Sequence, residues 1–457
     1  MTASPDSARA PEAPAKATFL EAAAVYLKPR VLVIFFLGFS SGLPLALSGS
    51  TLLFWMAEVG VDLKTIGLFA LVGTPYTIKF LWAPIVDAFD VPLLGRWLGR
   101  RRSWLMLTQL ALIAAIALLG ANDPVAAPAM VALGALIVAA ASATQDIVID
   151  AFRVESLPEN EQAAGAASYV AAYRVAMLVS SAGALFLVTG FQSFGFSRQG
   201  GWTASYSVMA VLVIVGMLTT LFATEPEKST RADAVQHQEP ALKRLGHTIA
   251  GAFTDFFLRE GFHIALIVLA FVVLFKLTDA LAGVMTGPFA VKLGFTRNEY
   301  ATIIKGLGFV ATLIGGFAGG YVARSLPLAA SLWIGGLLQA AANLAFSWQA
   351  VVGRDIAWLS FAITVENFTS AIGTVIFVAY LSALCKNPLH TATQYALLTA
   401  FAAIGRTYLS SSAGFVAEAT GWVWFFAICA LSAIPGFLLL AWLQSQGHFK
   451  RLVPKKS

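Results

Sequence analysis

Charged residues are scarce in this chain of 457 residues. Asp, Glu, Lys and Arg make up 12% of it, about half of the share usual in soluble domains, and 58% of the residues are hydrophobic. So few charged groups cannot cover the surface of a soluble protein, and long apolar runs indicate that lipid is the solvent. The basic residues lie in short segments between these runs, which favours a role in membrane orientation over nucleic-acid binding.

Residues that support catalysis or metal binding are equally scarce. The two cysteines, Cys385 and Cys429, give neither a disulfide framework nor a metal-ligand spacing, and the five histidines form no ligand set. No G-x-x-x-x-G-K-[ST] motif is present, which excludes an ATP-driven pump of the P-loop type. The serines of "LSSSAG" at 409–414 have no nearby histidine to activate them. The sequence therefore predicts no cofactor, no metal and no enzymatic activity.

Twelve apolar runs approach or exceed the roughly 20 residues that a membrane-spanning helix needs. Their positions are 31–54, 65–86, 104–121, 129–151, 164–190, 203–223, 263–286, 300–323, 328–348, 356–381, 391–416 and 422–444. The predicted fold is an all-α membrane protein with two pseudo-symmetric six-helix bundles. Its predicted parts are a disordered tail (1–27), a first bundle (28–223), a cytoplasmic linker (224–262), a second bundle (263–445) and a basic tail (446–457).

The distribution of Lys and Arg predicts the orientation. With a cytoplasmic N-terminus, twenty basic residues fall in the tails and inward loops and only five in the outward loops. Because cytoplasmic loops carry an excess of Lys and Arg, both termini are expected in the cytoplasm.

The two halves also resemble each other. Gly60 and Gly294 occur at the same turn before the next helix, and Arg174 and Arg406 each precede a small-residue SSAG or SSSAG stretch. Paired bundles of this kind are typical of secondary transporters with a site near the midplane, although small residues also serve helix packing in general.

Ten ionisable side chains lie in or beside the predicted spans, where each costs a few kcal/mol at the bilayer centre. They are Lys79, Asp87, Asp146, Asp150, Arg174, Lys276, Asp279, Lys305, Glu366 and Arg406. We expect them to face one another or a watery cavity. Depth along antiparallel helices pairs Asp146 with Arg174 and Glu366 with Arg406, at about one helical turn of offset each.

Local spacing predicts two further pairs. Lys276 and Asp279 are three residues apart and can neutralise each other, and Asp150 can pair with Arg153 at the cytoplasmic end. Lys79 has no acid on its own helix at that depth, which favours a functional role.

For the interhelix pairs, structural pairing and a role in substrate or proton binding both remain open. Lys305 can snorkel to the interface or point inward, and Gln145 is interpreted as a polar group of a cavity. The glycine-rich "GGFAGG" at 315–320 is interpreted as packing material.

Several motifs, in order along the chain, resemble the AmpG-type muropeptide permeases of the Major Facilitator Superfamily. The motifs are "GFSSGLPLALSGSTLLFWM", "LKTIGLFALVG", "FLWAPIVDAF" with "GRRRSWL", "SATQDIVIDA", "FKLTDA", "VENF" and "TATQYALLTAFAAIGR". The similarity extends from about Lys28 to Trp442. The chain departs from it in a longer N-terminal tail and in extra residues within "VPLLGRWLGRRR".

The resemblance implies import of N-acetylglucosaminyl-1,6-anhydro-N-acetylmuramyl peptides from periplasm to cytoplasm, driven by protons across the inner membrane of a Gram-negative bacterium. It also implies a role in cell-wall recycling and a link to β-lactamase induction. A monomer is expected.

Such a cargo carries sugar hydroxyls, amides and carboxylates, and the predicted site contains matching groups. The predicted substrate-binding residues are Lys79, Gln145, Tyr173, Arg174, Lys276, Asn367, Gln394, Tyr395 and Arg406. The candidate proton carriers are Asp146, Asp279 and Glu366, because burial favours a protonated carboxyl group while a nearby cation opposes it. The predicted gating residues are Asp87, Arg100, Arg101, Arg102 and Asp150.

Three alternatives remain open. The same fold can carry another solute, such as acetyl-CoA or a peptide. A membrane enzyme acting on lipid-linked precursors would need a nucleophile or metal cluster at one interface. A sensor without transport activity would need a signalling domain larger than the segment 224–262.

Overall fold

A computed structural model describes residues 24–158, 161–226, 257–258, 261–385 and 391–452, and in these ranges the chain forms helices and connecting segments without strands. The first half contains η1 (Val25–Leu27), α2 (Pro29–Ser48), α3 (Ser50–Glu58), α4 (Leu63–Leu68), η2 (Phe69–Gly73), α5 (Thr74–Ile78), η3 (Lys79–Leu81), α6 (Ala83–Ala88), α7 (Leu94–Leu98), α8 (Arg100–Ala121), α9 (Pro128–Ser156), α10 (Gln162–Leu178), η5 (Val179–Gly183), α11 (Ala184–Ser193), α12 (Arg198–Leu212) and α13 (Ile214–Phe222).

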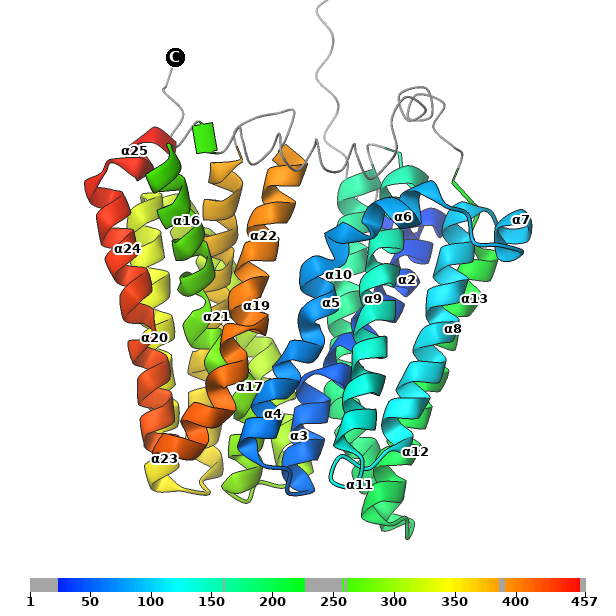
Figure 1. Ribbon diagram of the computed structural model, residues 1–457, viewed down its shortest axis with the longest axis horizontal. Helices are drawn as coiled ribbons and strands as arrows, with labels where there is room; N and C mark the ends of the chain where they lie inside the picture. Colours follow the sequence, from blue (N-terminus) through cyan, green and yellow to red (C-terminus); the bar gives the residue numbers. More distant parts are fainter. Residues whose placement is uncertain (1–23, 159–160, 227–256, 259–260, 386–390, 453–457) are drawn as a thin grey trace, which may run out of the picture.

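The second half contains α16 (Phe262–Phe275), α17 (Leu277–Lys292), α18 (Arg297–Tyr300), η6 (Ala301–Leu307), α19 (Gly308–Ser325), α20 (Leu328–Val352), α21 (Ile356–Leu384), α22 (Thr391–Thr407), η7 (Leu409–Ser412), α23 (Ala413–Leu431), α24 (Ala433–Ser445) and α25 (His448–Leu452). Figure 1 shows the helices of each half running side by side, with the last described helix, α25, at one end of the bundle. We call this the terminal end, and the opposite end, with the connections 59–62 and 293–296, the loop end.

Ten helical stretches in the described ranges are long and apolar enough to cross a membrane. The predicted second span, 65–86, is absent from this set because it is divided into the short helices α4 to α6 with 3-10 turns between them. The last two predicted spans are joined in one stretch, Leu397–Ser445, which bends at Gly421, where φ is 75°. These two differences reconcile ten stretches with the twelve predicted spans.

The repeat between the halves is visible in how two helices begin. Gly60 and Gly294 both have positive φ, 89° and 84°, at corresponding sharp turns of the loop end. Two residues later, the side chains of Asp62 and Thr296 each accept a hydrogen bond from a backbone N–H of the next helix. Such capping satisfies backbone donors that the first turn of a helix leaves unpaired.

Glycines allow close approach of helices within each half. A Cβ atom on Gly38 of α2 would lie 2.7 Å from the carbonyl oxygen of Tyr169 on α10, and one on Gly319 of α19 would lie 2.9 Å from the Cα atom of Ile372 on α21. The prediction that the segment 315–320 is packing material is therefore confirmed for Gly315 and Gly319, because only small residues permit such contacts between membrane helices, whereas Gly316 and Gly320 face open space.

Candidate functional site

The first half holds an ion pair on its inner helices. Asp146 of α9 accepts a hydrogen bond from the Ser41 hydroxyl at 2.5 Å, and Ser41 also lies 2.8 Å from the Tyr169 hydroxyl. The ammonium of Lys79 lies 3.8 Å from the second carboxylate oxygen of Asp146. Lys79 retains 34% of its side-chain exposure while Asp146 retains 12%. The site therefore offers a partly accessible cation in front of a nearly buried carboxylate.

This arrangement corrects one expectation. Lys79 has no acid on its own helix, as expected, and its acidic partner, Asp146, lies on another helix. Asp146 pairs with Lys79 rather than with Arg174, and no ion pair within the described ranges includes Arg174 or Arg406. Depth along a helix does not specify which way the helix is rotated about its own axis.

Arg406 lies near the tyrosines of the opposite half. Its side chain is exposed, and its charge acts on the hydroxyl groups of Tyr76 and Tyr173. Arg174 is also exposed and acts on Tyr173. Two unneutralised guanidinium groups therefore lie close to the Lys79–Asp146 pair, which makes the region attractive to an anion.

The second half holds a separate polar cluster around Asp279. Its carboxylate lies 2.5 Å from the Lys276 ammonium, which confirms the predicted pair. The same Asp279 oxygen accepts hydrogen bonds from Gln339 at 2.9 Å and Ser370 at 2.6 Å. Lys276 also donates to Thr374 at 3.1 Å. Three helices, α17, α20 and α21, thus hold this carboxylate in place.

Glu366 and Asn367 extend the cluster along α21. The Asn367 amide donates to Glu366 at 2.7 Å, while its carbonyl oxygen accepts from Thr312 of α19 at 3.3 Å. The charges of Lys276 and Lys305 both act on Glu366. The predicted Glu366–Arg406 pair is therefore wrong, and Asn367 links α19 to α21.

Lys305 proves to be an inward-facing residue. It lies in the π-helical turn η6, and its ammonium donates to the Ser50 hydroxyl of α3 at 3.3 Å. The contact crosses from one half of the chain to the other. π-turns inside α-helices are frequent at functional sites because they re-aim one side chain.

Next to these clusters, the two halves touch through Thr77 of α5 and Thr407 of α22. Their hydroxyl oxygens are 3.2 Å apart and buried. Lys79 is two residues from Thr77, and Arg406 is next to Thr407. In each helix the basic residue is the one nearer to the terminal end. The basic groups are thus located where contact between the halves ends.

Closer to the loop end, a largely buried ion pair joins the halves. The Arg297 guanidinium lies 2.6 Å from Glu58, and the two side chains are 12% and 19% exposed. Arg297 also donates to Gln192 at 2.8 Å, and the Trp202 indole donates to Glu58 at 2.9 Å. A second pair between the halves, Lys64–Glu418 at 3.0 Å, is much more exposed.

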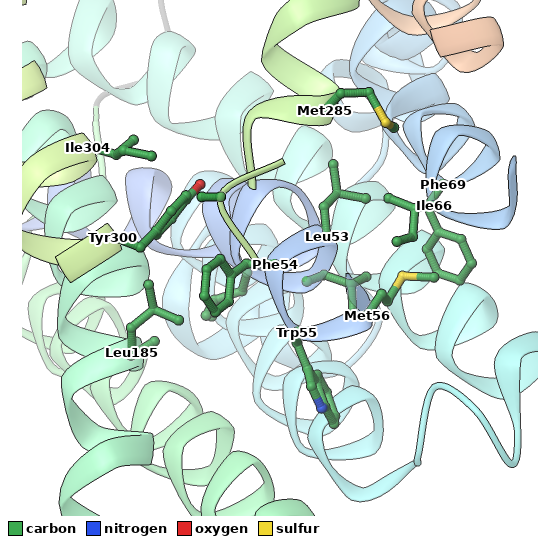
Figure 2. Packing of buried hydrophobic residues seen from close by; sticks show 14 of the residues in the cluster. Leu53, Phe54, Trp55, Met56, Ile66, Phe69, Leu185, Met285, Tyr300 and Ile304 are labelled. Carbon is green, nitrogen blue, oxygen red and sulfur yellow. The ribbon is translucent and has the colours of Figure 1, made fainter. Parts of the chain in front are cut away.

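Apolar side chains seal the same end. Figure 2 shows Leu53, Phe54, Trp55 and Met56 of α3 pointing in different directions, with Phe54 toward Tyr300 and Leu53 on the side of Met285. The rings of Phe54 and Tyr300 have centroids 4.5 Å apart. One continuous hydrophobic cluster includes buried residues of both halves. The loop end is therefore closed to water by packing as well as by charge.

The predicted gating arginines lie at the terminal end and bind acids of their own half. Arg101 forms a two-pronged contact with Glu155 of α9, at 2.6 and 3.0 Å. Glu225 accepts from the backbone N–H groups of Arg101 and Arg102, and Arg100 lies 3.8 Å from Glu155.

Of the two other predicted gating residues, the structure describes the side chain of one only. Asp150 pairs with Arg153 at 3.7 Å, as predicted. Asp87 belongs to α6, but its side chain lies outside the described residues.

Three predicted substrate-binding residues lie elsewhere. Gln145 is fully buried and accepts from Ser40 at 3.4 Å, so it joins α9 to α2 instead of lining a cavity. Gln394 and Tyr395 are eleven or more residues from Arg406 on α22, or about 17 Å along the axis. Tyr395 packs against the hydrophobic cluster of the second half.

Sequence reasoning missed several polar residues of the site. Ser41, Gln339 and Ser370 are ordinary small or polar residues in apolar runs, and only the neighbouring carboxylates give them a role. Glu58 and Arg297 could have been singled out from the sequence, because both lie next to the repeated glycine turns at Gly60 and Gly294.

Comparison with known proteins agrees with this architecture. A model of the Major Facilitator Superfamily matches residues 34–406. The anhydromuropeptide permease of Escherichia coli (strain K12) is 39% identical over 417 residues, covering 91% of this chain and 80% of the relative. The putative transporter AmpG 4 of Rickettsia felis is 35% identical and is covered over 97% of its length.

A crystal structure of a POT family transporter in complex with a thioalcohol-conjugated peptide has a TM-score of 0.66, with 11% identity, over 91% of this chain and 96% of that one. Likeness at this identity concerns the fold. The apolar helices and the relatives together identify a multi-pass protein of the bacterial inner membrane. With a family match over most of its length and a 39% identical relative, the chain belongs to the Major Facilitator Superfamily, in the group that includes the anhydromuropeptide permease.

Proposed function

We propose that this chain imports anhydro-muropeptides from the periplasm to the cytoplasm for cell-wall recycling, by proton symport and alternating access. In this proposal the monomer lies with both termini in the cytoplasm. The bundles 28–223 and 263–445 move relative to each other, and the linker 224–262, most of which lies outside the described residues, joins them. The cargo would feed the signal for β-lactamase induction, and the chain acts as a permease and not as an enzyme.

One observation carries the proposal: the interactions between the halves lie on one side of the basic groups. The contacts Glu58–Arg297 and Lys64–Glu418 lie near the loop end, and Thr77–Thr407 lies on the loop-end side of Lys79 and Arg406. At the terminal end, the contacts of Arg101 with Glu155 and of Arg102 with Leu221 join helices of the first half to one another. A carrier that is closed toward the periplasm and open toward the cytoplasm has this asymmetry.

The charges of the site suit an anionic cargo. A muropeptide brings several carboxylates, and Lys79, Arg174 and Arg406 supply cations that are exposed or partly exposed. In a low-dielectric cavity, charge-assisted hydrogen bonds to carboxylates are stronger than neutral ones. The tyrosine hydroxyl groups beside them can bond sugar hydroxyls and amides.

Proton coupling is assigned to carboxylates next to cations. Asp146 faces Lys79, and Asp279 faces Lys276, so a proton on either acid would release a lysine to bind an anionic substrate. Glu366 lies close to Lys305, which contacts Ser50 of the first half. Protonation there can therefore influence contact between the halves.

Uptake of radiolabelled anhydro-muropeptide into proteoliposomes tests this function. We expect wild-type uptake to rise with an inward proton gradient, and Arg406→Gln and Asp146→Asn to reduce uptake at least tenfold, since each removes about 1.5–3 kcal/mol of charged hydrogen bonding. Lys292→Gln, an exposed lysine of α17 remote from the clusters, is the matched control. Normal uptake by Asp146→Asn would remove this residue from the mechanism.

The same preparation separates the alternatives. Uptake of acetyl-CoA or of a free peptide in place of the muropeptide would assign another solute to this fold. If the folded protein takes up none of the three compounds, the transporter assignment of this chain is contradicted.

A further inference from the structure

Helix α7 and the segment before it present an apolar surface at the outer edge of the first half. Trp97 is 87% exposed, Leu93 is 79% exposed and Phe89 is 63% exposed. Leu93 immediately precedes α7 as its N-cap residue, and Trp97 belongs to α7 itself. Single exposed apolar residues are ordinary, but three within nine residues form a patch that needs a partner.

The backbone holds this patch in an unfavourable conformation. Leu93 has φ of 66°, and it is the one non-glycine residue with positive φ in the described ranges. A bulky side chain rarely adopts this region, so its occurrence points to a requirement for the position of the side chain. On the opposite side, Val91 is 7% exposed and anchors the segment to the bundle.

The surface continues into the lipid-facing side of the bundle. Figure 1 shows α7 at the periphery, beside the ends of α8 and α13. Arg102 of α8 donates to the carbonyl oxygen of Leu221 at 2.7 Å, which fixes these two helix ends together. The next residue, Phe222, is 84% exposed, and Leu110 of α8 is 46% exposed. The patch on α7 therefore lies where the membrane-spanning surface reaches its boundary.

The charge next to the patch identifies the chemistry of the partner. Arg96 lies between Leu93 and Trp97 and is exposed, and no carboxylate among the described residues lies within ion-pair distance of it. Trp and Arg next to apolar side chains are typical of the membrane–water interface. Basic groups at this depth attract the phosphate of anionic phospholipids.

We propose that α7 is an interfacial anchor: its apolar face enters the headgroup region of the membrane, and Arg96 binds an anionic phospholipid. The anchor fixes the connection between the second and third spans to the bilayer, while the rest of the bundle is free to move. The inference is independent of the transported substrate.

Spin labelling measures where α7 lies. In a Cys385→Ser, Cys429→Ala background, a nitroxide is attached at Trp97→Cys in the full chain, in vesicles of phosphatidylcholine and phosphatidylglycerol in equal amounts. Val125→Cys in an exposed loop calibrates water, and Phe317→Cys, 81% exposed in a span, calibrates lipid. We expect Trp97→Cys to be accessible to oxygen and shielded from a nickel chelate, between the two calibrators. Exposure to nickel equal to that of Val125→Cys, or shielding from both reagents as in a protein contact, would overturn the proposal.

Native mass spectrometry measures the bound lipid. We expect Arg96→Gln to lower retention of phosphatidylglycerol about fivefold, the effect of one basic residue at an anionic surface, and to leave phosphatidylcholine unchanged. Arg324→Gln, an exposed arginine at the terminal end of α19, is the matched control. An equal loss with Arg324→Gln, or equal loss of both lipids with Arg96→Gln, would assign the effect to net charge and refute the site on α7.

Discussion

Replacing Glu58 with Gln should open the loop end of the protein. The carboxylate lies 2.6 Å from Arg297 and accepts the Trp202 indole N–H at 2.9 Å. Glutamine keeps the size of the side chain and its oxygen acceptor but removes the charge. The substitution therefore destabilises the state in which the loop end is closed, because the ion pair forms in that state.

The magnitude follows from burial. An exposed ion pair contributes about 0–1 kcal/mol, while removing one partner of a fully buried pair costs about 3–5 kcal/mol. Arg297 and Glu58 keep 12% and 19% of their exposure, and Arg297 retains its bond to Gln192, so a cost of about 2 kcal/mol is expected. This cost corresponds to a shift of about thirtyfold in the ratio of open to closed molecules.

Distances between nitroxide labels at Val125→Cys and Ile356→Cys report the opening, because these exposed residues belong to different halves at the loop end. In Glu58→Gln, we expect a longer distance to gain population by about this factor. Glu418→Gln breaks the exposed pair with Lys64 and should shift the ratio less than fivefold. Equal effects of the two substitutions, or no lengthening in Glu58→Gln, would refute the argument from burial.

Two further predictions concern the loop end. Gly414→Ala should destabilise the folded protein by about 1–3 kcal/mol, because the new Cβ atom would meet the backbone of Leu63; a lower melting temperature measures this, and Gly316→Ala, with open space around it, should not lower it. Hydrogen bonds from Thr65, led by its backbone N–H, hold the pKa of Asp62 below the ordinary 3.8. The stabilisation from this cap, about 1 kcal/mol, is thus complete above pH 3.8 and is lost as the pH falls through the lowered pKa. Asp62→Ala should therefore lower the melting temperature at pH 7, and the difference from wild type should shrink as the pH falls below 3.8.

Much of the architecture followed from local properties of the sequence. A span needs a certain length of apolar chain, and the Lys276–Asp279 pair needs only a separation of three residues on one helix. The glycine turns at Gly60 and Gly294 are also local, since positive φ favours glycine wherever the chain turns sharply. These features could be predicted because each depends on neighbours along the chain.

The partners of the buried charges were decided by tertiary structure. Asp146 lies with Lys79 instead of Arg174, and Lys305 reaches Ser50 in the other half. Counting residues from a turn gives depth in the membrane, but which side chains meet also depends on the rotation of each helix. That rotation is set by packing of several helices at once and by local breaks such as the π-turn at Lys305. The sequence thus determined which charges lie in the apolar runs and how far along each helix they lie, while only the packed bundle decided which of them face each other.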